Sequence, residues 1–360
     1  MAPITSNFRT DAPMHHKARE AFLSAIDQGW HDPRKLGHQS AKTAILRQEA
    51  LSSIAQHFGV DVTEVEIIGE PGLATFYAVH GLLQTGHRLI HSVIDRKEIY
   101  AIAQNWESVS QVAVNGHGKI STEDLLLAAK ESQGVFALQI ANGETGVMQS
   151  VEKLISTAEN FQISCDYTQT LPHLSLPSRW STASFNAASW QGPAGVGVIL
   201  INRQARWKNP IPHIGTERTP NTVSLPLLLA SAVALEEWRK EAAERSVRLR
   251  SLNAQIRQAF TQINNSFIAG HLDDSMEHLI SASFDDVEGE ELLRSLEVDG
   301  ISVDSGSACS ADNLRPSHVL ASMGLPTHGN VRITLHPEIT DSEVIALIES
   351  VRRNVEILRK

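Results

Sequence analysis

Hydrophobic and polar positions follow two different periods along residues 40–201. Apolar residues that recur every three to four positions predict helices, and short unbroken apolar runs predict buried strands. The predicted helices cover 40–58 and 72–83, and two more begin at residues 122 and 151. The predicted strands cover 65–68, 88–93, 111–114, 134–140, 161–165, 182–186 and 195–201. This alternation favours an α/β fold with a largely parallel sheet covered by helices on both faces.

A different order of elements follows the proline-rich stretch at 210–226. We expect a helix over 227–263, a strand at 278–284, a helix at 289–296, a strand at 301–303, a helix from residue 316, a strand at 330–335 and a final helix. The final helix begins with a capping-box pattern, in which Thr340 and Glu343 each satisfy a free backbone N–H. These patterns predict a large domain over residues 15–235 and a smaller α+β domain formed by 1–14 and 236–360.

The composition is that of a globular protein. Of the 360 residues, 42% are hydrophobic and 20% are charged, and the formal net charge is -10. No run of basic residues could neutralise phosphates along a duplex, so no nucleic-acid partner is expected. The N-terminus lacks the pattern of a secretory signal, and no apolar run reaches the ~18 residues that a membrane span requires. We therefore expect a cytoplasmic protein without a membrane partner.

The cysteines and histidines predict neither a disulfide framework nor a zinc site. The two cysteines, Cys165 and Cys309, are too few and too far apart for a set of disulfides. The nearest group of histidines, His80, His87 and His91, straddles a helix end and a strand and lacks the spacing of a zinc motif. Cys165 lies on a predicted buried strand, so we expect it to be a small core residue.

The segment 305–310 carries the most specific pattern in the chain. Its sequence is Ser-Gly-Ser-Ala-Cys-Ser. These small and polar neighbours predict that Cys309 lies on a loop, where a thiol is accessible and can be deprotonated for attack. A small cysteine buried in a turn is the alternative. Arg332 follows in the segment 330–334, and its planar fork can bind a carboxylate through two bonds, although an arginine on a surface strand is the other interpretation.

These segments resemble motifs of the cysteine desulfurases, which belong to the class V aminotransferase family and have the fold-type I architecture. The resemblance extends over nearly the whole chain. It implies that the loop with Cys309 carries a persulfide and that Arg332 binds the carboxylate of a substrate. It also implies a cleft for the cofactor of the family, pyridoxal phosphate.

Two further segments resemble motifs that hold this cofactor. Residues 142–146, Asn-Gly-Glu-Thr-Gly, are similar to an Asn-Asn-Glu-x-Gly turn, and residues 166–169, Asp-Tyr-Thr-Gln, are similar to an Asp-Ala-x-Gln motif. The resemblance implies that Asp166 pairs with the pyridine nitrogen of the cofactor, that Gln169 reaches its ring oxygen and that Asn142 lines the cleft. Taken without the resemblance, an aspartate at the end of a strand is equally well explained as a loop cap.

The lysine that such an enzyme needs to form an imine with the cofactor is replaced by serine. The Gly-Pro-x-Gly-x-Gly pattern at 192–197 sets the register of this motif. In that register Ser189 takes the lysine position, Ala188 the histidine position and Asn186 the position of a serine that holds phosphate. Because a hydroxyl cannot form an imine, we expect no covalently bound cofactor.

The phosphate-binding loop departs from the family pattern in the same direction. The family's Ser-Gly-Ala-Thr-Glu falls on residues 69–73, where Glu70 places a carboxylate beside the phosphate and Pro71 removes a backbone donor. A pair of like charges ~4 Å apart costs about 4 kcal/mol at an effective dielectric constant of about 20. The same residues predict a helix that caps itself, with Glu70 as the anion at its N-terminus and Pro71 in its first position.

Further positions of the cleft differ as well. Arg96 stands where the family has an imidazole that stacks on the cofactor ring, and Gly143 stands for the second asparagine of the turn. In the family, a turn brings a threonine to the phosphate across the dimer. This turn is shortened around Thr219, and the shortening weakens the assignment of Thr219 as a phosphate contact. The residues that the resemblance places around this degenerate cleft are Gly72, Arg96, Asn142, Asp166, Gln169, Asn186, Ser189 and Thr219.

Three functions are compatible with this pattern. In the first, pyridoxal phosphate chemistry is lost. Cys309 then accepts sulfur as a persulfide from a donor and passes it to an acceptor, or it binds iron or an iron–sulfur cluster. Arg332 holds an anion. In the second, the chain is an active desulfurase or lyase that uses another lysine, Lys97 or Lys208. In the third, it is a non-catalytic partner of an active paralogue. A homodimer is expected otherwise, since fold-type I proteins build their site across a two-fold interface.

Overall fold

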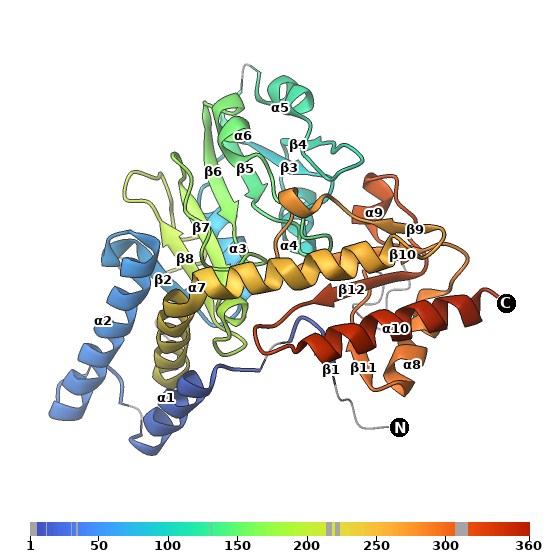
Figure 1. Cartoon of the computed structure of the whole chain (residues 1–360). Coiled ribbons are helices and arrows are strands. Elements are labelled where there is room, and N and C mark those ends of the chain that lie inside the picture. Colours follow the sequence, from blue (N-terminus) through green and yellow to red (C-terminus); the bar gives the residue numbers. More distant parts are fainter. Residues whose placement is uncertain are drawn as a thin grey trace.

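The computed structural model describes residues 6–11, 13–29, 31–33, 35–130, 132–213, 218–219, 224–306 and 316–360. A seven-stranded sheet in the order β2-β8-β7-β6-β5-β3-β4 lies at the centre (Figure 1). Its strands are β2 (Val65–Ile68), β3 (Arg88–Ser92), β4 (Val109–Val112), β5 (Gly134–Gln139), β6 (Phe161–Asp166), β7 (Thr182–Asn186) and β8 (Gly197–Ile201). Strands β7, β6, β5, β3 and β4 are parallel to one another, and β8 is antiparallel to both β7 and β2. This mainly parallel sheet confirms the predicted α/β fold.

Apolar side chains on alternate positions of the strands meet two layers of helices. Leu89 and Val135 pack with α3 and α4 on one face, whereas the next residues, Ile90 and Phe136, pack with α2, α5, α6 and α7 on the other. Burial on both faces explains why the strands read as unbroken apolar runs. The helices are α2 (His38–Phe58), α3 (Pro71–His80), α4 (Lys97–Gln104), α5 (Thr122–Ala129), α6 (Val151–Thr157) and α7 (Leu225–Phe260).

Two smaller sheets form the rest of the described structure. Strands β9 (Ser266–Ile268), β10 (Leu279–Phe284) and β12 (Asn330–Thr334) make an antiparallel sheet, and β1 (Ser6–Phe8) pairs in parallel with β11 (Ile301–Val303). The helices here are α8 (Gly289–Val298), α9 (His318–Ser322) and α10 (Asp341–Leu358). Thr340 caps α10 through the predicted capping box with Glu343.

Helix α7 connects these parts. It packs against α1 (His16–Asp27) and α2 and reaches strands β9 and β10 (Figure 1). The predicted boundary at residue 235 falls inside this continuous helix, so the division into two domains stays a prediction. Among the described residues, no helix is both long and apolar enough to cross a bilayer.

The structure adds elements that the sequence pattern does not predict. Helices α1 and α4 and strands β1 and β9 are absent from the predicted set, and β4 begins two residues earlier than predicted. The short strand β1 exists because it pairs with β11, which lies almost 300 residues later in the chain. No local pattern of three residues can indicate such a distant partner.

Candidate functional site

The residues predicted for the cofactor cleft converge at one edge of the seven-stranded sheet. Strands β2, β3, β5, β6 and β7 run in the same direction, so all of them end at this carboxyl edge. Ligands bind outside the carboxyl ends of the strands in open α/β sheets. The residues at or just after these strand ends are Glu70, Arg96, Asn142, Asp166, Asn186 and Ser189.

Arg96 contacts three neighbours at the carboxyl edge. Its Nε donates to Glu98 Oε2 at 2.7 Å, its Nη1 donates to Thr168 Oγ1, and Nη1 lies 3.8 Å from Asp166 Oδ2. Thr168 in turn donates to Asp166 Oδ1 from its backbone N–H at 2.8 Å and from its hydroxyl at 2.6 Å. We call Arg96, Glu98, Asp166 and Thr168 the Arg96 cluster. The carboxylate predicted to face a pyridine nitrogen therefore faces a guanidinium.

The Arg96 guanidinium balances several carboxylates. Burial disfavours its charged form, but the charges of Asp166, Glu98 and Glu70 outweigh burial and raise the pKa of Arg96. The adjacent Asp95 is 1% exposed, and burial raises the pKa of its carboxyl to about 8. Asp166 adds to that rise, because a second negative charge nearby disfavours the ionised form of Asp95.

Helix α3 caps its own N-terminus, which confirms the prediction. Glu70 is the N-cap residue and accepts a hydrogen bond of 2.7 Å from the backbone N–H of Leu73, and Pro71 takes the first helical position. A Cβ atom on Gly72 would lie 2.9 Å from Glu70 Oε2 and 3.2 Å from Glu98 Oε1. Two carboxylates therefore crowd the helix end where the resemblance places a phosphate.

The other polar side chains of the cleft are also used within the chain. Asn142 accepts backbone N–H groups of its own turn and donates to the carbonyl of Ile94. Asn186 accepts the N–H two residues later and so begins the short 3-10 helix η2 (Ala187–Trp190). Within η2, Ser189 Oγ donates to the carbonyl of Thr168 at 3.1 Å. The predicted lysine position thus lies next to the Arg96 cluster.

A small cavity lies beside Ser189. Its volume is about 60 Å³, and it is lined by Gln169, Asn186 and Ser189 but not by Arg96 or Asp166. Its lining, taken over the described parts of the chain, contains no lysine. Gln169 lies so close to Gly143 that a Cβ atom there would be 2.6 Å from Gln169 Cγ.

Arg332 on β12 is paired with an aspartate of this chain. Its Nη2 donates to Asp304 Oδ2 and to Thr10 Oγ1, both at 2.9 Å, and its Nη1 donates to the carbonyl of Gly143 at 3.4 Å. The N-terminal segment covers this pair, since the backbone and hydroxyl of Thr10 donate to Asp304 Oδ2 and Arg9 Nε donates to Asp304 Oδ1. Burial opposes a charge on Asp304, but Arg332 and Thr10 outweigh burial and lower its pKa. The group predicted to bind a carboxylate therefore holds an internal one.

The remaining predicted residues lie apart from the Arg96 cluster or outside the described structure. Thr219 Oγ1 donates to Glu66 Oε2 at 2.9 Å on β2, so within this chain it does not join Asp166. Cys309 lies outside the described residues, and its roles as a reactive thiol and as a metal ligand stay predictions. Cys165 is fully buried, and burial raises the pKa of its thiol, which confirms a core residue. Across the described ranges, no group of three or more His, Cys, Asp or Glu side chains could hold a metal ion.

Sequence reasoning missed two acidic residues of the site, Glu98 and Asp304. Glu98 lies two residues after Arg96 in the first turn of a helix that was not predicted, and recognising α4 would have suggested the pair. Asp304 is separated from Arg332 by 28 residues, and β11 and β12 bring the two together. The sequence holds no local signal for this second pairing.

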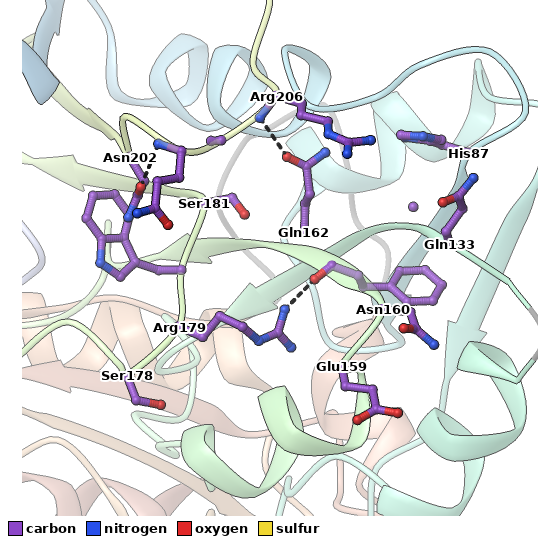
Figure 2. A pocket seen from close by; sticks show the side chains of 15 residues that line it. His87, Gln133, Glu159, Asn160, Gln162, Ser178, Arg179, Ser181, Asn202 and Arg206 are labelled. Atoms are coloured by element: carbon purple, nitrogen blue, oxygen red, sulfur yellow. Dashed lines mark hydrogen bonds between the residues drawn. The ribbon is translucent and has the colours of Figure 1, made fainter.

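A larger cavity lies at the opposite, amino edge of the sheet. Its volume is about 450 Å³, and its lining includes Gly134 and Phe161, the first residues of β5 and β6. Figure 2 shows the neighbouring Gln133 and Asn160 in this lining. At about 3.3 Å per residue, strand β6 places it roughly 17 Å from Asp166. The guanidinium of Arg179 donates to the carbonyl of Phe161 there, at 2.6 Å (Figure 2). None of the residues predicted for the cofactor cleft lines this cavity.

Comparison with known proteins decides the family. The family model of the class-V aminotransferases matches residues 31–347. The chain belongs to this family. This class-V aminotransferase is similar to the cysteine desulfurase IscS of Dictyoglomus turgidum, with 24% identity over 98% of this chain and 94% of that protein. It is 26% identical to the cysteine desulfurase IscS 1 of Archaeoglobus fulgidus, over 98% of this chain and 97% of that protein.

Solved structures support the same fold. The chain is similar to a NifS-like protein with a TM-score of 0.88 at 21% identity, over 98% of this chain and 99% of that one. A NifS-like protein of Rickettsia africae follows, with a TM-score of 0.86 at 17% identity over 98% of this chain and 99% of that one. The chain is therefore a cysteine desulfurase-like class-V aminotransferase with the fold-type I architecture.

The described residues do not fit pyridoxal phosphate, the cofactor that this family normally uses. A phosphate at the N-terminus of α3 would meet the carboxylate of Glu70, which already accepts the N–H of Leu73. Arg96 lies 3.8 Å from Asp166 Oδ2, on the carboxylate that the resemblance pairs with the pyridine nitrogen.

Proposed function

We propose that this cysteine desulfurase-like protein has lost pyridoxal phosphate catalysis and keeps a sulfur-handling thiol at Cys309. The observation that carries the proposal is the ion pair between Arg96 and Asp166 beside Ser189, because it puts a side chain of the protein where the family holds its cofactor. The match of residues 31–347 to the family supports the register in which Ser189 takes the lysine position.

The two other lysines considered do not offer a substitute amine. Lys97 is exposed at the start of α4. The backbone N–H of Lys208 donates to the carbonyl of Gly81, just after the C-terminal end of α3, whereas Glu70 lies at the N-terminal end. A helix of this length, 10 residues, is about 15 Å long. This geometry favours lost catalysis over an active enzyme with a relocated lysine.

The proposed chemistry at Cys309 is the transfer of a sulfur atom between thiols. The Cys309 thiolate attacks the outer sulfur of a donor persulfide, the sulfur–sulfur bond of the donor breaks, and the donor leaves as a thiolate. Cys309 then carries the persulfide, and no outside oxidant is needed. A protein or low-molecular-weight persulfide can be the donor, and an acceptor thiol reverses the same step.

An absorption spectrum tests the loss of the cofactor. The purified protein is incubated with pyridoxal phosphate and then reduced with borohydride. We expect no protein-bound visible band and no pyridoxyl group on any lysine in the peptide masses. A yellow protein that borohydride bleaches, and that releases alanine from cysteine, would show instead that the chain is an active desulfurase.

Peptide mass analysis after exposure to a persulfide donor tests the thiol. We expect added sulfur on the Cys309 peptide and none on the peptide of the fully buried Cys165, which serves as an internal control. The C309S variant should take up no sulfur. A Cys309 peptide that gains no sulfur under these conditions would contradict the role of this residue in sulfur transfer.

We also infer that the chain forms a homodimer, as a fold-type I site built across a two-fold interface requires. Light scattering of the purified chain should give twice the monomer mass. Co-purification with a second, lysine-bearing homologue would indicate the other assignment, a non-catalytic partner of an active paralogue.

A further inference from the structure

We propose that Glu70 and Arg96 are internal ligands of the cleft, which exclude pyridoxal phosphate even when an amine is present at position 189. The inference rests on the proposed loss of this cofactor and names the residues that keep it out. Replacement of the lysine would abolish the imine alone, whereas these two side chains take the places of the phosphate and of the ring.

Glu70 acts on the phosphate side. The N-terminus of a helix binds anions through its free N–H groups and its partial positive charge. In α3 the carboxylate of Glu70 already accepts the N–H of Leu73, and Pro71 has no N–H to offer. A phosphate there would stand about 4 Å from a like charge, which lowers its affinity roughly a thousandfold.

Arg96 acts on the ring side. Its guanidinium lies between Glu98 Oε2, at 2.7 Å, and Asp166 Oδ2, at 3.8 Å, and it also donates to Thr168. A cofactor ring over Asp166 would need Arg96 to move away. Glu98 would then lose its partner in a site where 19% of its side chain is exposed.

The two internal ligands support each other. Glu98 Oε1 and Glu70 Oε2 both lie within 3.2 Å of the position that a Gly72 Cβ atom would take, so their carboxylates are neighbours. Arg96 neutralises both, since the charges of Glu98 and Glu70 contribute to its raised pKa. Removing the excluding groups therefore requires changes at both residue 70 and residue 96.

Reintroduction of the amine tests the proposal. Variant S189K supplies only the lysine, and variant S189K/E70S/R96H also removes both internal ligands. E70S keeps a hydroxyl that can cap α3, and R96H supplies the imidazole found at this position in the family. We expect the triple variant to bind pyridoxal phosphate at least about a hundredfold more tightly than S189K by absorbance titration. Only the triple variant should keep a pyridoxyl group at position 189 after borohydride reduction.

A matched variant controls for the number and kind of substitutions. S189K/E123S/R206H changes an exposed acid in the first turn of α5 and an exposed arginine at the amino edge, and it should behave as S189K does. A triple variant that has native circular dichroism but binds pyridoxal phosphate no more tightly than S189K would overturn the proposal.

Two double variants cover the case in which the triple variant does not fold. S189K/E70S removes the like charge on the phosphate side and S189K/R96H opens the ring side, and at least one of them should bind pyridoxal phosphate at least about tenfold more tightly than S189K. If neither does so, the proposal is wrong. A wild-type protein that forms an imine through another lysine would instead refute the proposed function, so the two failures are distinguishable.

Discussion

The two edges of the seven-stranded sheet differ in how they use arginine. The amino edge has a cavity of about 450 Å³ that Arg179 lines, whereas the small cavity of about 60 Å³ beside Ser189 at the carboxyl edge is not lined by Arg96 or Asp166. At the amino edge, Arg179 donates to the carbonyls of Phe161 and Ala158 and so satisfies backbone groups. At the carboxyl edge, Arg96 meets the carboxylates of Glu98 and Asp166. The edge where the family motifs converge is thus the one at which an arginine lies between carboxylates.

The difference has a physical origin in charge. Carboxylates that lie close together repel each other unless a cation lies between them. Arg96 supplies that cation, and Arg332 and Asp304 form a second such pair. Side chains of the protein therefore neutralise part of the charge of the cleft, although Asp166 Oδ2 and Arg332 Nε have no hydrogen-bond partner in the described structure.

Removal of the Arg96 cation should have the largest effect. R96A leaves Glu98 and Asp166 without their partner, and we expect the free energy of unfolding to fall by about 3–5 kcal/mol in urea titrations. R206A, which changes an exposed arginine at the amino edge, should change it by less than about 0.5 kcal/mol. Adding D166N to R96A should restore part of the loss. Similar losses for R96A and R206A would show that the two edges do not differ in this respect.

The next largest effect concerns the pH dependence of stability at the carboxyl edge, where Asp95 precedes Arg96 in the chain. Burial raises the pKa of Asp95 to about 8, so the folded protein keeps a proton that the unfolded chain releases above about pH 4. The contribution of protonated Asp95 to the free energy of unfolding is complete below about pH 4 and is lost as the pH rises towards 8. Between pH 5 and 7.5 the free energy of unfolding of the wild type should fall by about 3 kcal/mol relative to D95N. Parallel pH profiles of the two proteins would contradict the raised pKa.

The Arg332 pair should show the smallest of the three effects. Loss of Asp304 leaves one half-buried charge, Arg332, without its carboxylate partner, whereas Arg96 lies between two carboxylates that both lose theirs in R96A. We expect D304A to lower the free energy of unfolding by about 2 kcal/mol, because Thr10 and Arg332 lose their acceptor. D273A, at an exposed acid of the same half of the chain, is the matched control. An equal cost in the two variants would mean that the internal carboxylate contributes no special stability.

Much of the fold could be predicted because its signals are local. Strand β2 and strand β7 have the predicted bounds, and α10 begins at the predicted capping box. Because the central strands are buried on both faces, they are continuous apolar runs, and such runs can be recognised from the sequence alone. Strand β1 was missed because it depends on a distant strand. Helix α4 was also missed, although it is as long as the predicted helix α5.

The candidate site also has a part that the sequence predicts and a part that only the structure shows. The order of residues along the chain sufficed to show a serine at position 189, an acid at position 70 with a proline after it, and an arginine at position 96, since these depend only on the register of the motifs. Whether the changed residues leave an open cleft could not be predicted, because ion pairs form between side chains from different strands and their geometry is set by packing. The tertiary structure alone brought Arg96 to Asp166 and Asp304 to Arg332, and a protein interior leaves a charge without a partner only at a high cost in free energy.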